Sequence, residues 1–166
     1  AIKLNIIFKI IRKNGDGDEV IKTDTVADGG SYTFPAKNDK YANVKRFDGV
    51  SPTTGSYQPE AQITNITEDR VYEIVREYTV TIRDAETGQE LGTTTVEEGS
   101  PYTFQAATGV YEGVQTSQGV EATGTTGTYQ PQGVISSVNK DLVFDAQKAY
   151  TITIDGTVVD TVYAGE

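Results

Sequence analysis

The amino-acid sequence repeats itself at a spacing of about 70 residues, and this repetition limits the possible folds more than any other feature. The Tyr-Thr-Phe segment at 32–34 returns at 102–104, which is 70 positions later. The Gly-Ser-Tyr-Gln-Pro segment at 55–59 returns as Gly-Thr-Tyr-Gln-Pro at 127–131, which is 72 positions later. Two residues are therefore gained in the Gly/Thr-rich stretch at 120–127. A fixed period of this length is typical of tandem modules, each with a small core.

A third copy opens near the end of the sequence, because residues 150–154 restate residues 78–82. We therefore expect two complete modules and the start of a third, at residues 1–76, 77–148 and 149–166. The sequence begins with Ala1 and stops within a repeated motif, so we expect it to be a piece of a longer protein.

The first strand of module 1 is expected around Ile6, Phe8 and Ile10, whose apolar side chains alternate along the chain. Its offset from the corresponding strand of module 2 is predicted as 70 or 71, because the turns that follow the two strands differ in length. This choice affects the strand register and leaves the topology unchanged.

Alternating apolar and polar residues predict strands in every copy, as at 78–82 and 150–154. Turns rich in Asp, Asn and Gly follow these opening strands and predict hairpins. The segments at 63–69 and 135–141 have apolar residues three apart, and we expect a short helical turn there. The joints at 76–77 and 147–149 lack Gly, Pro and Ser, so one module is expected to continue into the next strand to strand.

Composition excludes several classes of function. The chain has 14 Lys and Arg against 24 Asp and Glu, a net charge of −10, which repels nucleic acid and anionic lipid. The longest apolar stretch, at 6–11, is broken by Lys9 and is far shorter than the ~20 residues of a membrane-spanning helix, so no membrane insertion is expected. The chain contains no Cys and no His, which removes disulfides, thiolate metal sites and the commonest catalytic base. We therefore expect no enzymatic activity and no cofactor.

Several short motifs resemble the repeats of Gram-positive cell-surface adhesins, in particular the mucin-binding-protein repeat and the internalin B-repeat. They are the alternating opener at 78–82, the turn containing Gly88, the step at 98–102 and the Gly-Thr-Tyr entry at 127–129. The chain departs from these repeats in its Gly/Thr-rich stretch and in having no Trp. The resemblance implies a mainly β fold of two small, β-grasp-like modules in an elongated arrangement, followed by a β-hairpin that starts a third.

The resemblance also implies a function and a location. We expect a repeat segment of an extracellular, cell-wall-attached adhesin, acting as a stalk with weak multivalent adhesion to host mucin glycans or extracellular matrix. The other expected partners are neighbouring repeats of the same chain. A dedicated carbohydrate-binding module is the alternative from another class, and a pilus or phage fibre segment is a third.

Aromatic residues are the main candidates for a sugar-binding surface, because sugar rings stack on aromatic faces. Residues that recur in every copy more often fill the core, so we predict core positions for Tyr32, Tyr57, Tyr102 and Tyr129. Aromatic residues that differ between copies are better ligand candidates. These are Phe47, whose counterpart is Ser117, and Tyr163.

Three further motifs carry weaker functional signals. The segment at 14–19 alternates Gly with oxygen ligands as calcium loops do, but it lacks the Glu at the twelfth position, so a hairpin turn is favoured. The sequon at 65–67 is assigned no function. Lys9 and Lys22 lie on or beside predicted strands and could form an isopeptide crosslink, for which the sequence identifies no partner.

Overall fold

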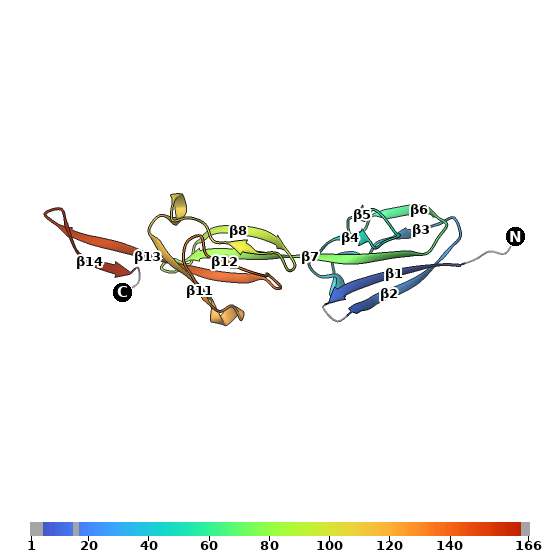
Figure 1. Ribbon diagram of the computed structural model, residues 1–166, viewed down its shortest axis with the longest axis horizontal. Coiled ribbons are helices and arrows are strands. Elements are labelled where there is room, and N and C mark those ends of the chain that lie inside the picture. The colour runs from blue at the N-terminus through green and yellow to red at the C-terminus, as the bar shows by residue number, and fades with distance from the viewer. Residues whose placement is uncertain (1–4, 15–16, 164–166) are drawn as a thin grey trace. The chain divides into compact units, whose positions relative to one another are not determined.

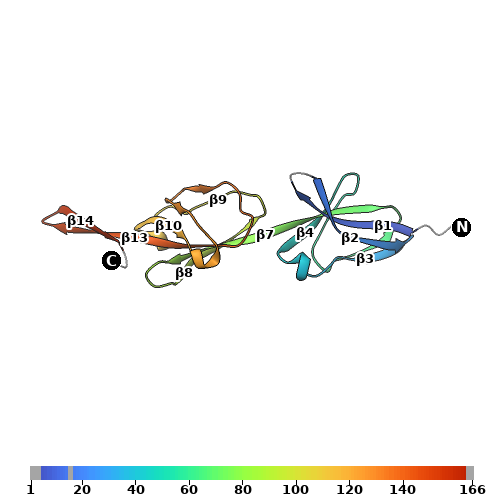
Figure 2. The same ribbon diagram turned by 90° about the horizontal axis from the view of Figure 1, so that it is seen from below.

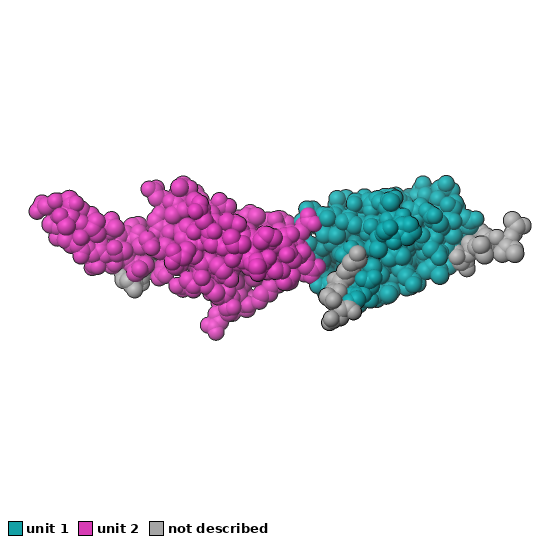
Figure 3. Space-filling model, viewed as in Figure 1, with its two compact units in different colours: residues 1–77 teal, residues 78–166 magenta. Residues whose placement is uncertain are grey.

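The computed structural model describes residues 5–14 and 17–163 and is mainly β, with a curled mixed sheet and only short helical turns (Figure 1). The chain divides into two compact units, residues 1–77 and 78–166 (Figure 3). Strand β7 (Arg70–Asp84) contributes its first half to unit 1 and its second half to unit 2.

The described residues of unit 1 form six further strands and one 3-10 turn. They are β1 (Asn5–Asn14), β2 (Gly17–Ala27), β3 (Gly30–Thr33), η1 (Asp39–Tyr41), β4 (Val44–Gly49), β5 (Ser56–Tyr57) and β6 (Gln62–Ile66). The main sheet has the order β2-β1-β7-β4-β5, in which β1 and β7 are parallel and the other neighbours are antiparallel. Strands β3 and β6 form a separate antiparallel pair.

The core of unit 1 lies between this sheet and the β3–β6 pair. Period-2 alternation on β1 turns Phe8 and Ile10 inward, where both are almost completely buried. The ring of Phe8 stacks on Tyr32 of β3 with centroids 3.7 Å apart, and on Tyr72 of β7 at 5.2 Å. Aromatic packing of this kind stabilises a small core beyond the area it buries.

Unit 2 repeats this arrangement. Its other elements are β8 (Glu90–Glu97), β9 (Tyr102–Thr103), η2 (Gly109–Tyr111), β10 (Val114–Gly119), η3 (Glu121–Thr123), β11 (Thr128–Tyr129), β12 (Val134–Ile135), β13 (Leu142–Ile154) and β14 (Thr157–Tyr163). The sheet order is β8-β7-β13-β10-β11, with β7 and β13 parallel, and β9 pairs with β12. The repeated sequence therefore folds twice into the same strand order.

The register of the opening strands corrects the predicted offset of 70 or 71. In unit 1 Ile10 pairs with Tyr72, and in unit 2 Ile82 pairs with Phe144. The opening strands therefore align at an offset of 72, the same as the closing strands. The prediction was wrong because it counted the length of the following turn, which lies outside the paired strands and does not set their register.

The helical turn expected at 63–69 and 135–141 is also absent. Ile63 lies in β6 and pairs with Tyr32, while Ile135 lies in β12 and pairs with Tyr102. In unit 1 the apolar residues lie three apart because the backbone of β6 kinks at Asn65, which has a left-handed φ of 54°. Asn tolerates this conformation better than most residues, and the change in direction turns Ile66 into the core.

The two residues gained in module 2 are accommodated in the short turn η3. Beyond η3 the buried Thr125 occupies the position that Thr53 has in unit 1. The Oγ1 of each Thr accepts a hydrogen bond from the closing strand, at 3.1 Å from Val71 N and at 3.4 Å from Val143 N. The insertion therefore bulges outward without displacing the buried contact.

Strands β13 and β14 form an antiparallel hairpin that projects beyond the rest of unit 2 (Figures 1 and 2). Tyr150, Ile152 and Ile154 of this hairpin correspond to Tyr78, Val80 and Ile82 of β7. Val80 and Ile82 are at most 2% exposed, whereas Ile152 and Ile154 are 44% and 60% exposed. The hairpin thus has the apolar face of an opening strand pair without the strands that cover it in units 1 and 2.

Candidate interaction surfaces

The repeated tyrosines lie in or against the cores. Tyr32 and Tyr102 are buried, as predicted, and Tyr57 and Tyr129 are half-buried and pack against the same clusters. Tyr129 stacks on Phe104 with centroids 4.9 Å apart and meets Phe144 edge-on at 5.7 Å. Since these rings are fixed by their neighbours, only the remaining exposed part of Tyr57 or Tyr129 is available to a ligand.

Phe47 was the wrong candidate for a sugar-stacking residue. Its side chain is fully buried and stacks on Phe34 with centroids 4.8 Å apart. The position faces inward on β4 and on β10, where Ser117 is also buried. The two copies therefore differ here in the volume of a core side chain, and this position is not a surface difference. Tyr163, the other candidate, is 40% exposed on β14.

Unit 2 contains a cavity of about 270 Å³ beside Tyr129. Tyr129, Ile135, Leu142 and Phe144 contribute apolar surface to it. The polar lining residues are Thr126, Ser137, Asn139 and Lys140, all of which are exposed. An apolar surface with a few polar groups is the usual composition of a small-molecule site. The prediction from sequence missed this cavity.

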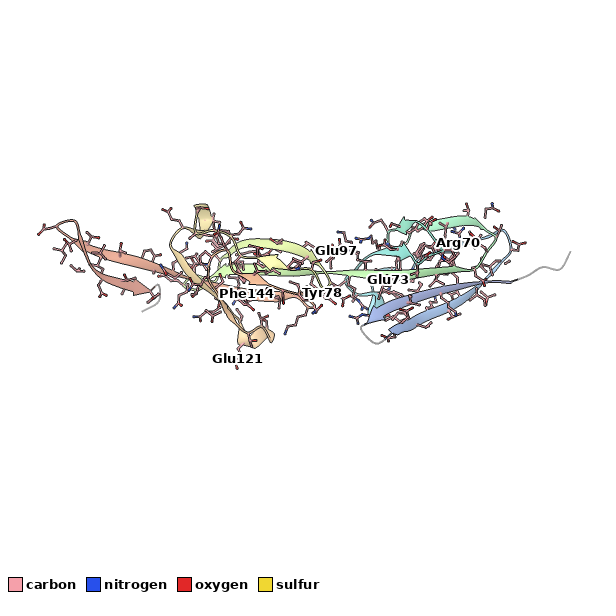
Figure 4. All side chains as sticks on the ribbon, viewed as in Figure 1. Arg70, Glu73, Tyr78, Glu97, Glu121 and Phe144 are labelled. Carbon is pink, nitrogen blue, oxygen red and sulfur yellow. The ribbon has the colours of Figure 1, made fainter. Side chains whose placement is uncertain are left out.

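A signal for the cavity was present in the comparison of the two copies. At the offset of 72, Arg70 and Tyr72 of unit 1 correspond to Leu142 and Phe144 of unit 2. Both changes replace a polar side chain with a smaller apolar one on the inward face of the closing strand. Figure 4 marks Arg70 on β7 and Phe144 on β13.

Arg70 lies beside the hydroxyl group of Tyr72 in unit 1. Burial raises the pKa of Tyr72, and the neighbouring Arg70 guanidinium opposes that increase. The Nε atom of Arg70 is itself shielded from solvent. This long side chain therefore occupies inner space that the shorter Leu142 leaves open in unit 2.

Of the segment at 14–19, Asn14 ends β1 and residues 17–19 begin β2, and Asn14 pairs with Gly17 in the β1–β2 hairpin. The other two residues of the segment, Gly15 and the possible calcium ligand Asp16, lie outside the described residues. Among the residues that the structure describes, no group of three or more Asp and Glu side chains is placed to hold a metal ion.

The lysines considered for an isopeptide crosslink lie at the surface. Lys9 is exposed on β1, and Lys22 on β2 forms an ion pair with Asp24 at 3.2 Å. Asp24 also accepts a hydrogen bond from the hydroxyl group of Tyr32 at 2.8 Å. The sequon at 65–67 lies at the end of β6, and its central residue, Ile66, is buried.

Fold and surfaces together define a mainly β protein in which one strand order is built twice. No known family model matches the chain, and no curated protein sequence matches it. Within residues 5–14 and 17–163, no helix has the length and apolar character needed to cross a membrane.

Proposed function

We propose that the chain is a repeat segment of a Gram-positive cell-surface adhesin, acting as an extracellular, wall-attached stalk with weak multivalent adhesion to host mucin glycans or matrix. The observation that carries this proposal is the continuity of strands between copies. The closing strand of the first copy and the opening strand of the second are one strand, β7, and β13 repeats this for the second and third copies. Such continuity suits a protein that grows by adding copies in series.

The strand order supports a β-grasp-like layout for each module. In both units an antiparallel hairpin leads to a sheet whose two central strands are parallel, and a small antiparallel pair covers the core. In the parallel pair the first and last strands of a copy lie side by side, so each copy completes its own sheet. Such a copy can be repeated without rearranging its neighbours.

A binding role without catalysis or cofactor is proposed on the chemistry of the side chains. The sequence has neither His nor Cys, and most of the large aromatic residues are buried in the two cores. Weak binding by each copy is sufficient for an adhesin, because linked sites raise the overall affinity by roughly 10²–10⁴.

A dedicated carbohydrate-binding module remains the second candidate, and the cavity beside Tyr129 is the observation that favours it. The two functions differ in valency. A dedicated module binds sugar tightly as a single copy, whereas a stalk depends on many copies acting together.

Two measurements test the proposal. Small-angle scattering should give a radius of gyration well above the about 15 Å expected for a compact globular chain of this length. Binding to mucin-coated and matrix-coated surfaces should strengthen steeply with the density of immobilised chains, both for the whole chain and for a version ending at residue 149. Compact scattering together with no binding at any density contradicts the proposal.

A further inference from the structure

We propose that the cavity of unit 2 binds a single pyranose sugar ring, and that the corresponding region of unit 1 does not. This inference rests on the proposed adhesive function and names the chemistry of one of its binding sites. The two units would then share a fold but differ in what they recognise.

The size of the cavity favours one ring. Its volume of about 270 Å³ lies just below the roughly 300–1,000 Å³ of pockets that hold drug-sized ligands. Tyr129 and Leu142 provide apolar surface for the C–H face of a sugar. Phe104 and Phe144 hold the Tyr129 ring in place, so binding requires no ordering of that side chain.

The polar residues around the cavity suit the hydroxyl groups of a sugar. Asn139 Nδ2 donates a hydrogen bond to Ser137 Oγ at 3.1 Å, which orients both side chains. The Ser137 hydroxyl keeps its own proton to donate, and the Asn139 amide keeps its carbonyl oxygen to accept. Thr126 adds a second hydroxyl group. Together these groups offer both donors and acceptors, which the alternating roles of sugar hydroxyls require.

Lys140 adds a positive charge at the same place. Its Nζ atom donates a hydrogen bond to the carbonyl oxygen of Gly124, which fixes the side chain against the inserted loop. The corresponding residue of unit 1 is Glu68, which has the opposite charge. An acidic substituent on the sugar is therefore tolerated in unit 2 and would be repelled in unit 1.

That unit 1 should not bind the same ligand is inferred from side-chain volume. Several inward positions are larger in unit 1 than in unit 2, among them the aligned pairs Phe8 and Val80, Phe47 and Ser117, Arg70 and Leu142, and Tyr72 and Phe144. Arg70 and Tyr72 occupy the positions whose counterparts line the cavity. Interiors pack closely, so these longer side chains fill the space that unit 2 leaves for a ligand.

The test is a titration of the isotopically labelled chain with galactose, N-acetylgalactosamine, N-acetylglucosamine, fucose and N-acetylneuraminic acid, followed by amide chemical shifts. At millimolar sugar we expect shifts concentrated at Tyr129, Ser137 and Asn139, with the equivalent residues of unit 1 unchanged. Asn139→Ala should weaken binding at least about threefold, the size expected for one lost hydrogen bond. Thr67→Ala, the matched change in unit 1, should leave the affinity unchanged.

A second variant replaces the cavity with the residues of unit 1. Leu142→Arg together with Phe144→Tyr should abolish the shifts, and an otherwise unchanged spectrum would show that unit 2 still folds. Asn139→Ala alters an exposed side chain, so it tests the site even if the double variant unfolds. The proposal is overturned if none of the five sugars shifts the cavity residues, or if Asn139→Ala and Thr67→Ala change the affinity equally.

The same variants separate this inference from the proposed function. If the whole chain binds mucin, Asn139→Ala binds it as well as the original and no sugar shifts the cavity residues, adhesion resides elsewhere and the sugar site is wrong. If the cavity binds sugar while scattering shows a compact chain, the sugar site stands and the stalk is wrong.

Discussion

Asp141 accepts a hydrogen bond from the backbone N–H of Thr79, with 2.9 Å between Oδ1 and the nitrogen. Asp69 makes the same bond to Ile7 at 2.8 Å in unit 1. Each Asp precedes a closing strand, and each backbone N–H belongs to the opening strand that lies parallel to it. The carboxylate therefore fixes the register of the two parallel strands. Its bond lies one residue before the first backbone pair between them.

Replacing this carboxylate should weaken each unit. We expect Asp141→Ala to lower the free energy of unfolding of unit 2 by about 1 kcal/mol, the usual net value of one hydrogen bond. Asp141→Asn keeps an acceptor oxygen and should cost less. Chemical denaturation of both variants measures the difference, and equal losses would show that the hydrogen bond is not the cause.

Equivalent apolar positions should respond very differently to truncation. Ile82→Ala should cost about 2–5 kcal/mol, because Ile82 is 2% exposed in the core of unit 2. Ile154→Ala, at the corresponding position of the terminal hairpin, should change stability by no more than about 0.5 kcal/mol. Thermal unfolding of the two variants tests this, and a large loss for Ile154→Ala would mean that its side chain is covered in solution.

The buried threonines provide a third comparison. Thr53→Val preserves shape but leaves the N–H of Val71 without its acceptor, so a loss of about 1–3 kcal/mol is expected. Thr125→Val should cost less, because the bond to Val143 is longer, at 3.4 Å against 3.1 Å. Denaturant titrations of both variants check the order, and the reverse order would contradict this assignment.

Alkaline pH should destabilise the chain through its buried tyrosines. Burial raises the pKa of Tyr32 above its ordinary 10.0, helped by the hydrogen bond to Asp24, and burial also raises the pKa of Tyr102. A raised pKa in the folded state contributes stability that is complete below about pH 10 and is lost as the pH rises above it.

Denaturant unfolding at a series of pH values should therefore show a midpoint that falls above about pH 10. Tyr32→Phe removes one titrating group, so its midpoint should fall less steeply over the same range. An identical slope in the variant would exclude Tyr32 from the effect.

Much of this architecture could be predicted from the repeat alone. The alternation at 78–82 and 150–154 indicated strands, and the uninterrupted joints indicated that strands continue from one copy into the next; β7 and β13 are such strands. These features depend on local pattern and on self-comparison, both of which a single sequence displays.

The remaining errors arose where three-dimensional packing decides. Phe47 and Ser117 differ between copies and looked like surface variation, yet both positions face the core. One sequence cannot distinguish a residue that varies because it is exposed from one that varies because its neighbours changed size. The cavity beside Tyr129 was missed for the same reason: two of its lining residues, Leu142 and Phe144, are smaller than their counterparts in unit 1, and only the fold shows that these positions lie side by side.

The parallel pairing of first and last strands also determines when a copy can fold during synthesis. Ile7 and Asp69 are 62 positions apart, so a copy emerging from the ribosome must wait for nearly its whole length before its closing strand appears. Until then its opening hairpin exposes apolar side chains, a state that attracts chaperones and invites aggregation.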